Sequence, residues 1–131
     1  MSTDSLIASV SPFFVVDSLS ESLDFYNNRL GFLTDFVIPE DDPFFAIVER
    51  GPAKILLKEI APEIHPVPNH TRHEWARWDA LVLTSDPDAL FAEFSSHGVH
   101  IHDPLTDTDD GLRAFEIQDN NGYVLCFGRP L

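Results

Sequence analysis

The chain has 131 residues, a length typical of one domain, and its 44% hydrophobic and 23% charged residues are an ordinary globular composition. A formal net charge of −14 argues against nucleic-acid binding, which needs a basic surface, and favours either solubility or attraction of cationic ligands. No segment approaches the ~20 apolar residues of a membrane helix, and MSTDSLIASVSPFF lacks the basic start of a signal peptide, so we expect a cytoplasmic protein.

The first predicted unit begins with a short apolar strand over residues 13–16. The Asp17-Ser18 pair that follows provides N-cap side chains, and apolar residues at helical spacing predict a helix over residues 19–30. Gly31 is suited to end that helix. Farther on, FFAIVERGPAKILLKEI predicts two antiparallel strands around a turn at Gly51-Pro52.

A segment rich in proline and histidine, APEIHPVPNHTRHEW, separates this unit from the next and is typical of a loop. Its His65, His70 and His73, like the later pair His100 and His102, are either polar loop and strand-edge residues or partial metal-binding patterns. Neither group has a clear third ligand at a fixed spacing. The first reading is therefore favoured.

The second unit repeats the order of the first. A strand over residues 80–83 precedes the cap pair Ser85-Asp86, a predicted helix over residues 87–97, and Gly98. LRAFEIQDNNGYVLCFG then predicts a hairpin that turns at Asn121-Gly122. The repeat predicts one α+β domain, residues 1–131, built from two βαβββ modules with curved, mixed or antiparallel sheets facing each other and helices outside. Module one spans about residues 8–60, the linker about 61–76 and module two about 77–131.

The sequence resembles the vicinal oxygen chelate superfamily of glyoxalases, bleomycin resistance proteins and extradiol dioxygenases. The resemblance rests on VDSLSESLDFYNNRLGF and FEIQDNNGYVLCF, and it is closest to the bleomycin-resistance-like branch in FYNNRLGFLTDF, FFAIVERGPAKILL and LRAFEIQD. Asn120 stands where the family often has proline, and Tyr123 where it often has asparagine. The resemblance implies the same two-module fold. It also implies a homodimer in which each pocket combines residues of both chains.

Metal-dependent relatives place ligands on the first and last strands of each module. The matching positions here are Ser11, Leu56 or Leu57, Asp79 and Cys126. Leucine cannot bind a metal and serine is a poor neutral ligand, so only Asp79 and Cys126 are suitable. We therefore expect no metal or other cofactor.

Cys126 has three possible roles: nucleophile, metal ligand or buried small hydrophobe. Strand alternation places it with Val124 on the inner face of the sheet, opposite Tyr123, Leu125 and Phe127. No histidine close in sequence could activate the thiol, which favours the buried-hydrophobe reading.

We expect a pocket on the inner faces of the sheets. Its predicted residues are Phe13, Asp79, Leu81, Arg113 and Cys126, with Trp75 or Trp78 at the rim. The two tryptophans could equally be core residues, and Arg113 could bind a ligand anion or pair with a nearby aspartate such as Asp109 or Asp110. The burial of Asp79 would be costly unless it met Arg113, a backbone donor or a cationic ligand.

Two functions remain open. The missing ligands and the acidic charge favour a metal-free protein of the bleomycin-resistance type over an enzyme. Such a protein would sequester a small planar or cationic molecule at a dimer interface. The alternative is a metal-dependent lyase or dioxygenase, which only the fold supports.

Overall fold

The computed structural model describes residues 6–131, so the first five residues of the predicted domain lie outside the described part. Module one contains β1 (Phe13–Val15), α1 (Leu19–Asn28), β2 (Leu33–Ile38), β3 (Phe45–Arg50) and β4 (Ala53–Lys58). A long connection with one 3₁₀ turn, η2 (Asn69–Thr71), leads to module two. That module contains β5 (Ala80–Leu83), α2 (Pro87–Ser96), β6 (His100–Asp107), β7 (Leu112–Gln118) and β8 (Val124–Pro130).

Each module forms one four-stranded sheet, in the order β1-β4-β3-β2 and β5-β8-β7-β6. The first strand of each module pairs in parallel with the last one, and the other neighbours are antiparallel. This repeated topology confirms the predicted α+β class and the two βαβββ modules.

Both helices begin at the predicted caps. The Ser18 side chain accepts a hydrogen bond from the Glu21 amide at 3.3 Å, and the Asp86 carboxylate accepts one from the Ala89 amide at 3.1 Å. Gly31 and Gly98 lie just beyond the helix ends with φ of 72° and 71°, a backbone conformation that favours glycine. The two helices are therefore confirmed to within two residues at their ends.

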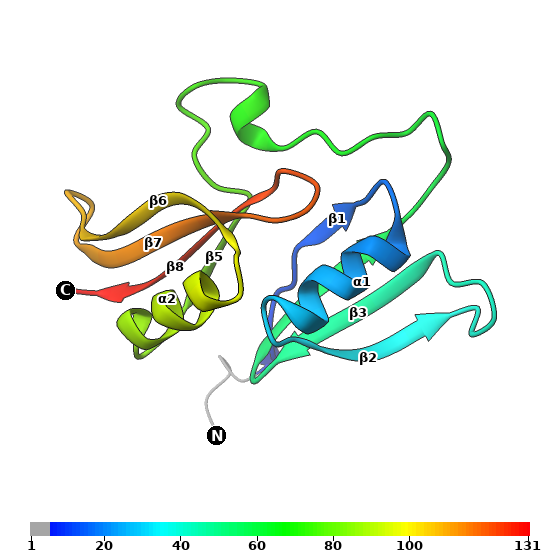
Figure 1. Ribbon diagram of the computed structural model, residues 1–131, viewed down its shortest axis with the longest axis horizontal. Coiled ribbons are helices and arrows are strands. Elements are labelled where there is room, and N and C mark those ends of the chain that lie inside the picture. The colour runs from blue at the N-terminus through cyan, green and yellow to red at the C-terminus, as the bar shows by residue number, and fades with distance from the viewer. Residues whose placement is uncertain (1–5) are drawn as a thin grey trace.

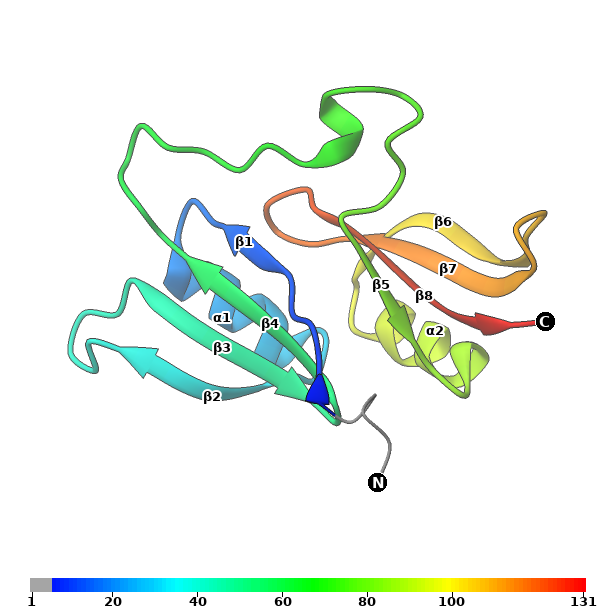
Figure 2. The ribbon, with the colours of Figure 1, turned by 180° about the vertical axis from the view of Figure 1, so that it is seen from behind.

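One helix covers one face of each sheet (Figure 1). The main core lies between the helices and the sheet faces that they cover. Seen from behind, the sheets lie side by side with their uncovered faces on the same side of the molecule (Figure 2). We expected the two sheets to face each other, but within the chain they do not. The modules meet instead through their helices and the edges of their sheets. We call the two uncovered faces the open faces.

Polar contacts tie the modules together. The buried Tyr26 hydroxyl of α1 donates to Asp119 at 2.7 Å, and Tyr123 donates to the Val15 carbonyl at 2.6 Å. Arg50 and Glu93 form a bidentate ion pair at 2.6 and 2.9 Å.

Within residues 6–131, none of the helices has the length and apolar character needed to cross a membrane.

Candidate functional site

The open face of the first sheet carries an apolar row that crosses all four strands. Strand pairing aligns Phe36, Ile47, Leu56 and Phe13. Phe13 is 52% and Phe36 45% exposed, and both rings pack beside Phe45, with centroids 6.3 and 6.4 Å away. A contiguous patch of large apolar side chains that are exposed to solvent is typical of a binding surface. We call these five residues the aromatic row.

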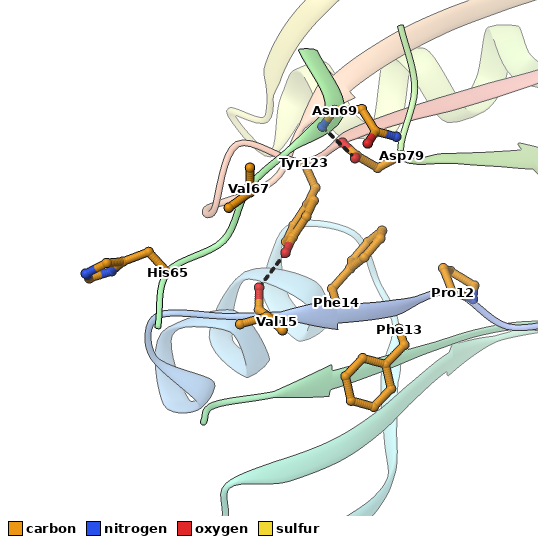
Figure 3. A pocket seen from close by; sticks show the side chains of 9 residues that line it. All are labelled: Pro12, Phe13, Phe14, Val15, His65, Val67, Asn69, Asp79 and Tyr123. Atoms are coloured by element: carbon orange, nitrogen blue, oxygen red, sulfur yellow. Dashed lines mark hydrogen bonds between the residues drawn. The ribbon is translucent and has the colours of Figure 1, made fainter. Parts of the chain in front are cut away.

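A cavity of about 470 Å³ lies at the edge of this face, between β1, the linker and module two (Figure 3). The residues that line it are Pro12, Phe13, Phe14, Val15, His65, Val67, Asn69, Asp79 and Tyr123. The ring of Phe14 stacks on that of Tyr123 at 4.2 Å between centroids, which builds a rigid aromatic wall. Phe13 and Asp79, predicted as pocket residues, thus line one cavity.

A second cavity, of about 300 Å³, lies where the edge of the first sheet meets β5. Leu81 lines it and is 45% exposed, as predicted for a residue of the inner face. Pro12 lines both cavities, so they adjoin. Trp75, Trp78, Arg113 and Cys126 line neither.

Asp79 is held by backbone donors. Its Oδ1 accepts from the Asn69 amide and its Oδ2 from the Val124 amide, both at 2.9 Å. These two hydrogen bonds supply the backbone donors that a partly buried carboxylate needs, and they connect the linker to β8. Asp79 therefore lines the cavity and has a structural role there.

The two tryptophans differ in setting. Trp78 is partly buried, its Nε1 donates to Glu116 at 3.0 Å, and the Arg77 guanidinium lies 4.8 Å from its ring centre. Trp75 is 82% exposed on the linker, with its ring against that of His73.

Arg113 lies away from both cavities, in an ion-pair group on the outer side of module two. It donates to both oxygens of Asp88 at 2.7 and 2.8 Å and to Asp107 at 3.0 Å. The pairing with aspartates was one of the two readings of this arginine. The partners are Asp88 and Asp107 rather than Asp109 or Asp110.

Cys126 is 1% exposed on β8, between Leu81 of β5 and Glu116 of β7. Burial raises the pKa of its thiol to about 12, and the negative charge of Glu116 acts in the same direction. The thiol therefore stays protonated near neutral pH, which does not fit a nucleophile.

The residues at the family's metal positions do not fit a metal ion. Leu56 and Leu57 offer no ligand atom, both oxygens of Asp79 are engaged by amides, and Cys126 is held as the neutral thiol. In the part of the chain that the structure describes, no group of three or more His, Cys, Asp and Glu side chains could hold a metal ion. The histidines make other contacts: His65 pairs with Asp17 and His70 with the Gly122 carbonyl, both at 2.8 Å.

Glu116 is the residue that the sequence reading missed. It is 7% exposed in the interior strand β7, on the open face of the second sheet. A signal was available, because Glu116 stands between Phe115 and Ile117 in a strand whose other face is core. A charged residue at such a position is rarely buried without a partner.

The comparisons with known proteins agree with this geometry. The family model described as the glyoxalase/bleomycin resistance protein/dioxygenase superfamily matches residues 7–127. No protein of curated function matches the sequence significantly.

Solved structures share the fold. The bleomycin-binding protein of Streptomyces verticillus, complexed with copper(II)-bleomycin, is 21% identical with a TM-score of 0.69, over 94% of this chain and 96% of its own. TnmS3, an antibiotic binding protein from Streptomyces sp. CB03234, is 23% identical with a TM-score of 0.67, over 94% and 97%. A glyoxalase-related enzyme from Clostridium phytofermentans is 14% identical with a TM-score of 0.74, over 95% and 96%. Binding proteins and an enzyme therefore share this architecture.

Proposed function

Because the chain belongs to the glyoxalase/bleomycin resistance protein/dioxygenase superfamily, we propose that it binds and sequesters a planar small molecule in the cytoplasm, without a metal or other cofactor. The observation that carries this proposal is the aromatic row on the open face of the first sheet, together with the two adjoining cavities. Flat apolar walls with a few fixed polar groups are typical of small-molecule sites. Two similarly folded proteins are described as bleomycin-binding and antibiotic binding, which supports this class of function.

The site is incomplete in one chain, and we propose that a homodimer completes it. Phe13, Phe36, Leu81 and Leu83 remain 45–66% exposed on the open faces. A two-fold partner would cover such surfaces symmetrically and enclose a ligand between the modules of different chains. Leu6, Ile7 and Val10 precede Pro12 and are at least 77% exposed, so this arm is available to contact the partner.

A metal-dependent lyase or dioxygenase is the alternative, and the glyoxalase-related neighbour is the observation in its favour. It would need ligands other than those at the family's positions, because the donor set there does not fit. We therefore favour the binding protein.

The proposal is tested by a thermal-shift screen of planar aromatic compounds, followed by titration of a hit into Phe36→Ala and Phe44→Ala. Both phenylalanines are 45% exposed, but Phe36 belongs to the aromatic row whereas Phe44 precedes β3, beside Lys58. We expect Phe36→Ala to weaken binding by about tenfold, from the loss of aromatic contact, and Phe44→Ala to leave it unchanged. Equal affinity of the parent protein and Phe36→Ala for every hit would contradict the proposed site.

A further inference from the structure

Glu116 lies at the centre of the open face of the second sheet. Strand pairing sets Cys126 beside it on β8 and Asp103 beside it on β6, and Leu81 of β5 follows Cys126 in the same row. The side chain of Glu116 is 9% exposed. A carboxylate buried to this degree needs hydrogen-bond partners for its oxygens.

Only one of the two oxygens has such partners among the described residues. Oε2 accepts from Trp78 Nε1 at 3.0 Å and from Arg77 Nη2 at 3.4 Å. Oε1 faces His102 Nε2 at 4.0 Å, which is too far for a hydrogen bond. No fully buried side-chain nitrogen or oxygen in residues 6–131 lacks a partner, so Oε1 is not sealed from solvent. It is an acceptor without a hydrogen-bond donor among the described residues, on a side chain that the bonds to Oε2 hold in place.

The charge around Glu116 is negative on balance. Among the described residues, Arg77 is the one arginine or lysine that pairs with Glu116, and it is shared with Asp110 at 2.5 Å. An adjoining hollow of about 350 Å³ is lined by Arg77, Thr106, Thr108 and four aspartates, Asp103, Asp107, Asp109 and Asp110. A positively charged donor is the ligand group that such a setting favours.

We propose that the ligand carries a protonated nitrogen, an ammonium or amidinium, that donates to Glu116 Oε1 while its planar part lies on the apolar residues of the open faces. This inference rests on the proposed function and names the ligand class. The carboxylate that binds the cation is then Glu116 and not Asp79, because both oxygens of Asp79 accept hydrogen bonds from amides.

Three probes with the same aromatic ring and different charge test the inference: 1-naphthylmethylamine, 1-naphthalenemethanol and 1-naphthylacetate. Near neutral pH they are a cation, a neutral molecule and an anion. By calorimetric titration of the parent protein we expect the amine to bind at least about tenfold more tightly than the alcohol, because hydrogen bonds to charged groups are the stronger ones. The anion should bind most weakly.

Glu116→Gln keeps an acceptor for Trp78 but removes the charge, so the amine should lose its advantage over the alcohol. Asp88→Asn is the matched control, since it makes the same change in net charge on the outer side of module two. It should preserve the advantage. Thermal unfolding followed by circular dichroism verifies that both variants are folded.

The outcomes separate this inference from the function on which it rests. Equal affinity of amine and alcohol for the parent protein overturns the role of Glu116 while leaving a planar-ligand site in place, and this test needs no variant. An advantage of the amine that survives in Glu116→Gln also overturns it. Failure of all three probes to bind the parent protein contradicts the proposed function as well.

Discussion

Two carboxylates of module two show how strand position decides the role of a residue. Asp79 precedes β5 and satisfies two backbone amides, whereas Glu116 lies within β7 and keeps one oxygen free of donors in the described chain. Alternation predicted Leu81 on the inner face of its sheet, and the structure places it 45% exposed on the open face. Alternation could not distinguish the two carboxylates, because one partner of each, the Asn69 amide and the Trp78 indole, comes from the connection between β4 and β5 rather than from a strand.

Asp119 gives a prediction at the scale of one residue. It is 6% exposed, and burial raises its pKa to about 6 even though Tyr26 and two amides donate to it. A carboxyl whose pKa is higher in the folded state contributes stability at low pH, and this contribution is lost as the pH rises through about 6. The free energy of unfolding of the parent protein, relative to that of Asp119→Asn, should therefore rise by roughly 1 kcal/mol when the pH is lowered from about 7.5 to about 5.

Urea unfolding of parent and variant at both pH values measures this change. Asp88→Asn is the control, because hydrogen bonds from Arg113 lower the pKa of Asp88 and both pH values lie above its titration. Its difference from the parent should be the same at the two pH values. A pH-independent difference for Asp119→Asn as well would mean that Asp119 titrates normally in the folded protein.

At the scale of elements, the local pattern predicted more than the contacts between modules. Both helices, both hairpin turns and the succession of strands and helix along each module follow from caps, glycines and alternation. The side-by-side arrangement of the sheets does not, since it depends on pairs such as Arg50 with Glu93 and Tyr26 with Asp119, which are 43 and 93 residues apart. The cavities lie between elements of different modules, which is why the predicted pocket residues were only partly brought together.

The Arg50–Glu93 pair gives a prediction for the junction of the modules. Arg50 of β3 makes two hydrogen bonds to Glu93 of α2 and one, at 2.8 Å, to the Leu30 carbonyl. The hydrogen bond to Arg50 lowers the pKa of Glu93, but both side chains are about one-third exposed, so solvent screens the pair. A double-mutant cycle with Arg50→Gln and Glu93→Gln should give a coupling energy of about 1 kcal/mol.

The control for this cycle is Lys54 with Glu49, an ion pair at 3.5 Å between two strands of one module. Because the pair is more distant and similarly exposed, its coupling should be close to zero. Equal coupling energies in the two cycles, measured by urea unfolding, would show that the Arg50–Glu93 pair does not hold the modules together.

For the molecule as a whole, the proposed function requires that the open faces become covered. One chain leaves Phe13, Phe36, Leu81 and Leu83 exposed beside two adjoining cavities, and four aspartates line a hollow next to Arg77, which pairs with Glu116. A second copy and a planar ligand would together bury this apolar surface. Ligand binding and dimer formation should therefore occur together.

Native mass spectrometry of the protein at micromolar concentration, with the tightest planar ligand from the screen, tests this most directly. We predict a species of twice the mass of one chain that carries up to two ligand molecules, because a two-fold dimer has two equivalent sites. Monomers in the same spectrum should carry none. A monomer as the main species, or a ligand retained by monomer and dimer alike, would contradict the proposal that the open faces form the site at a dimer interface.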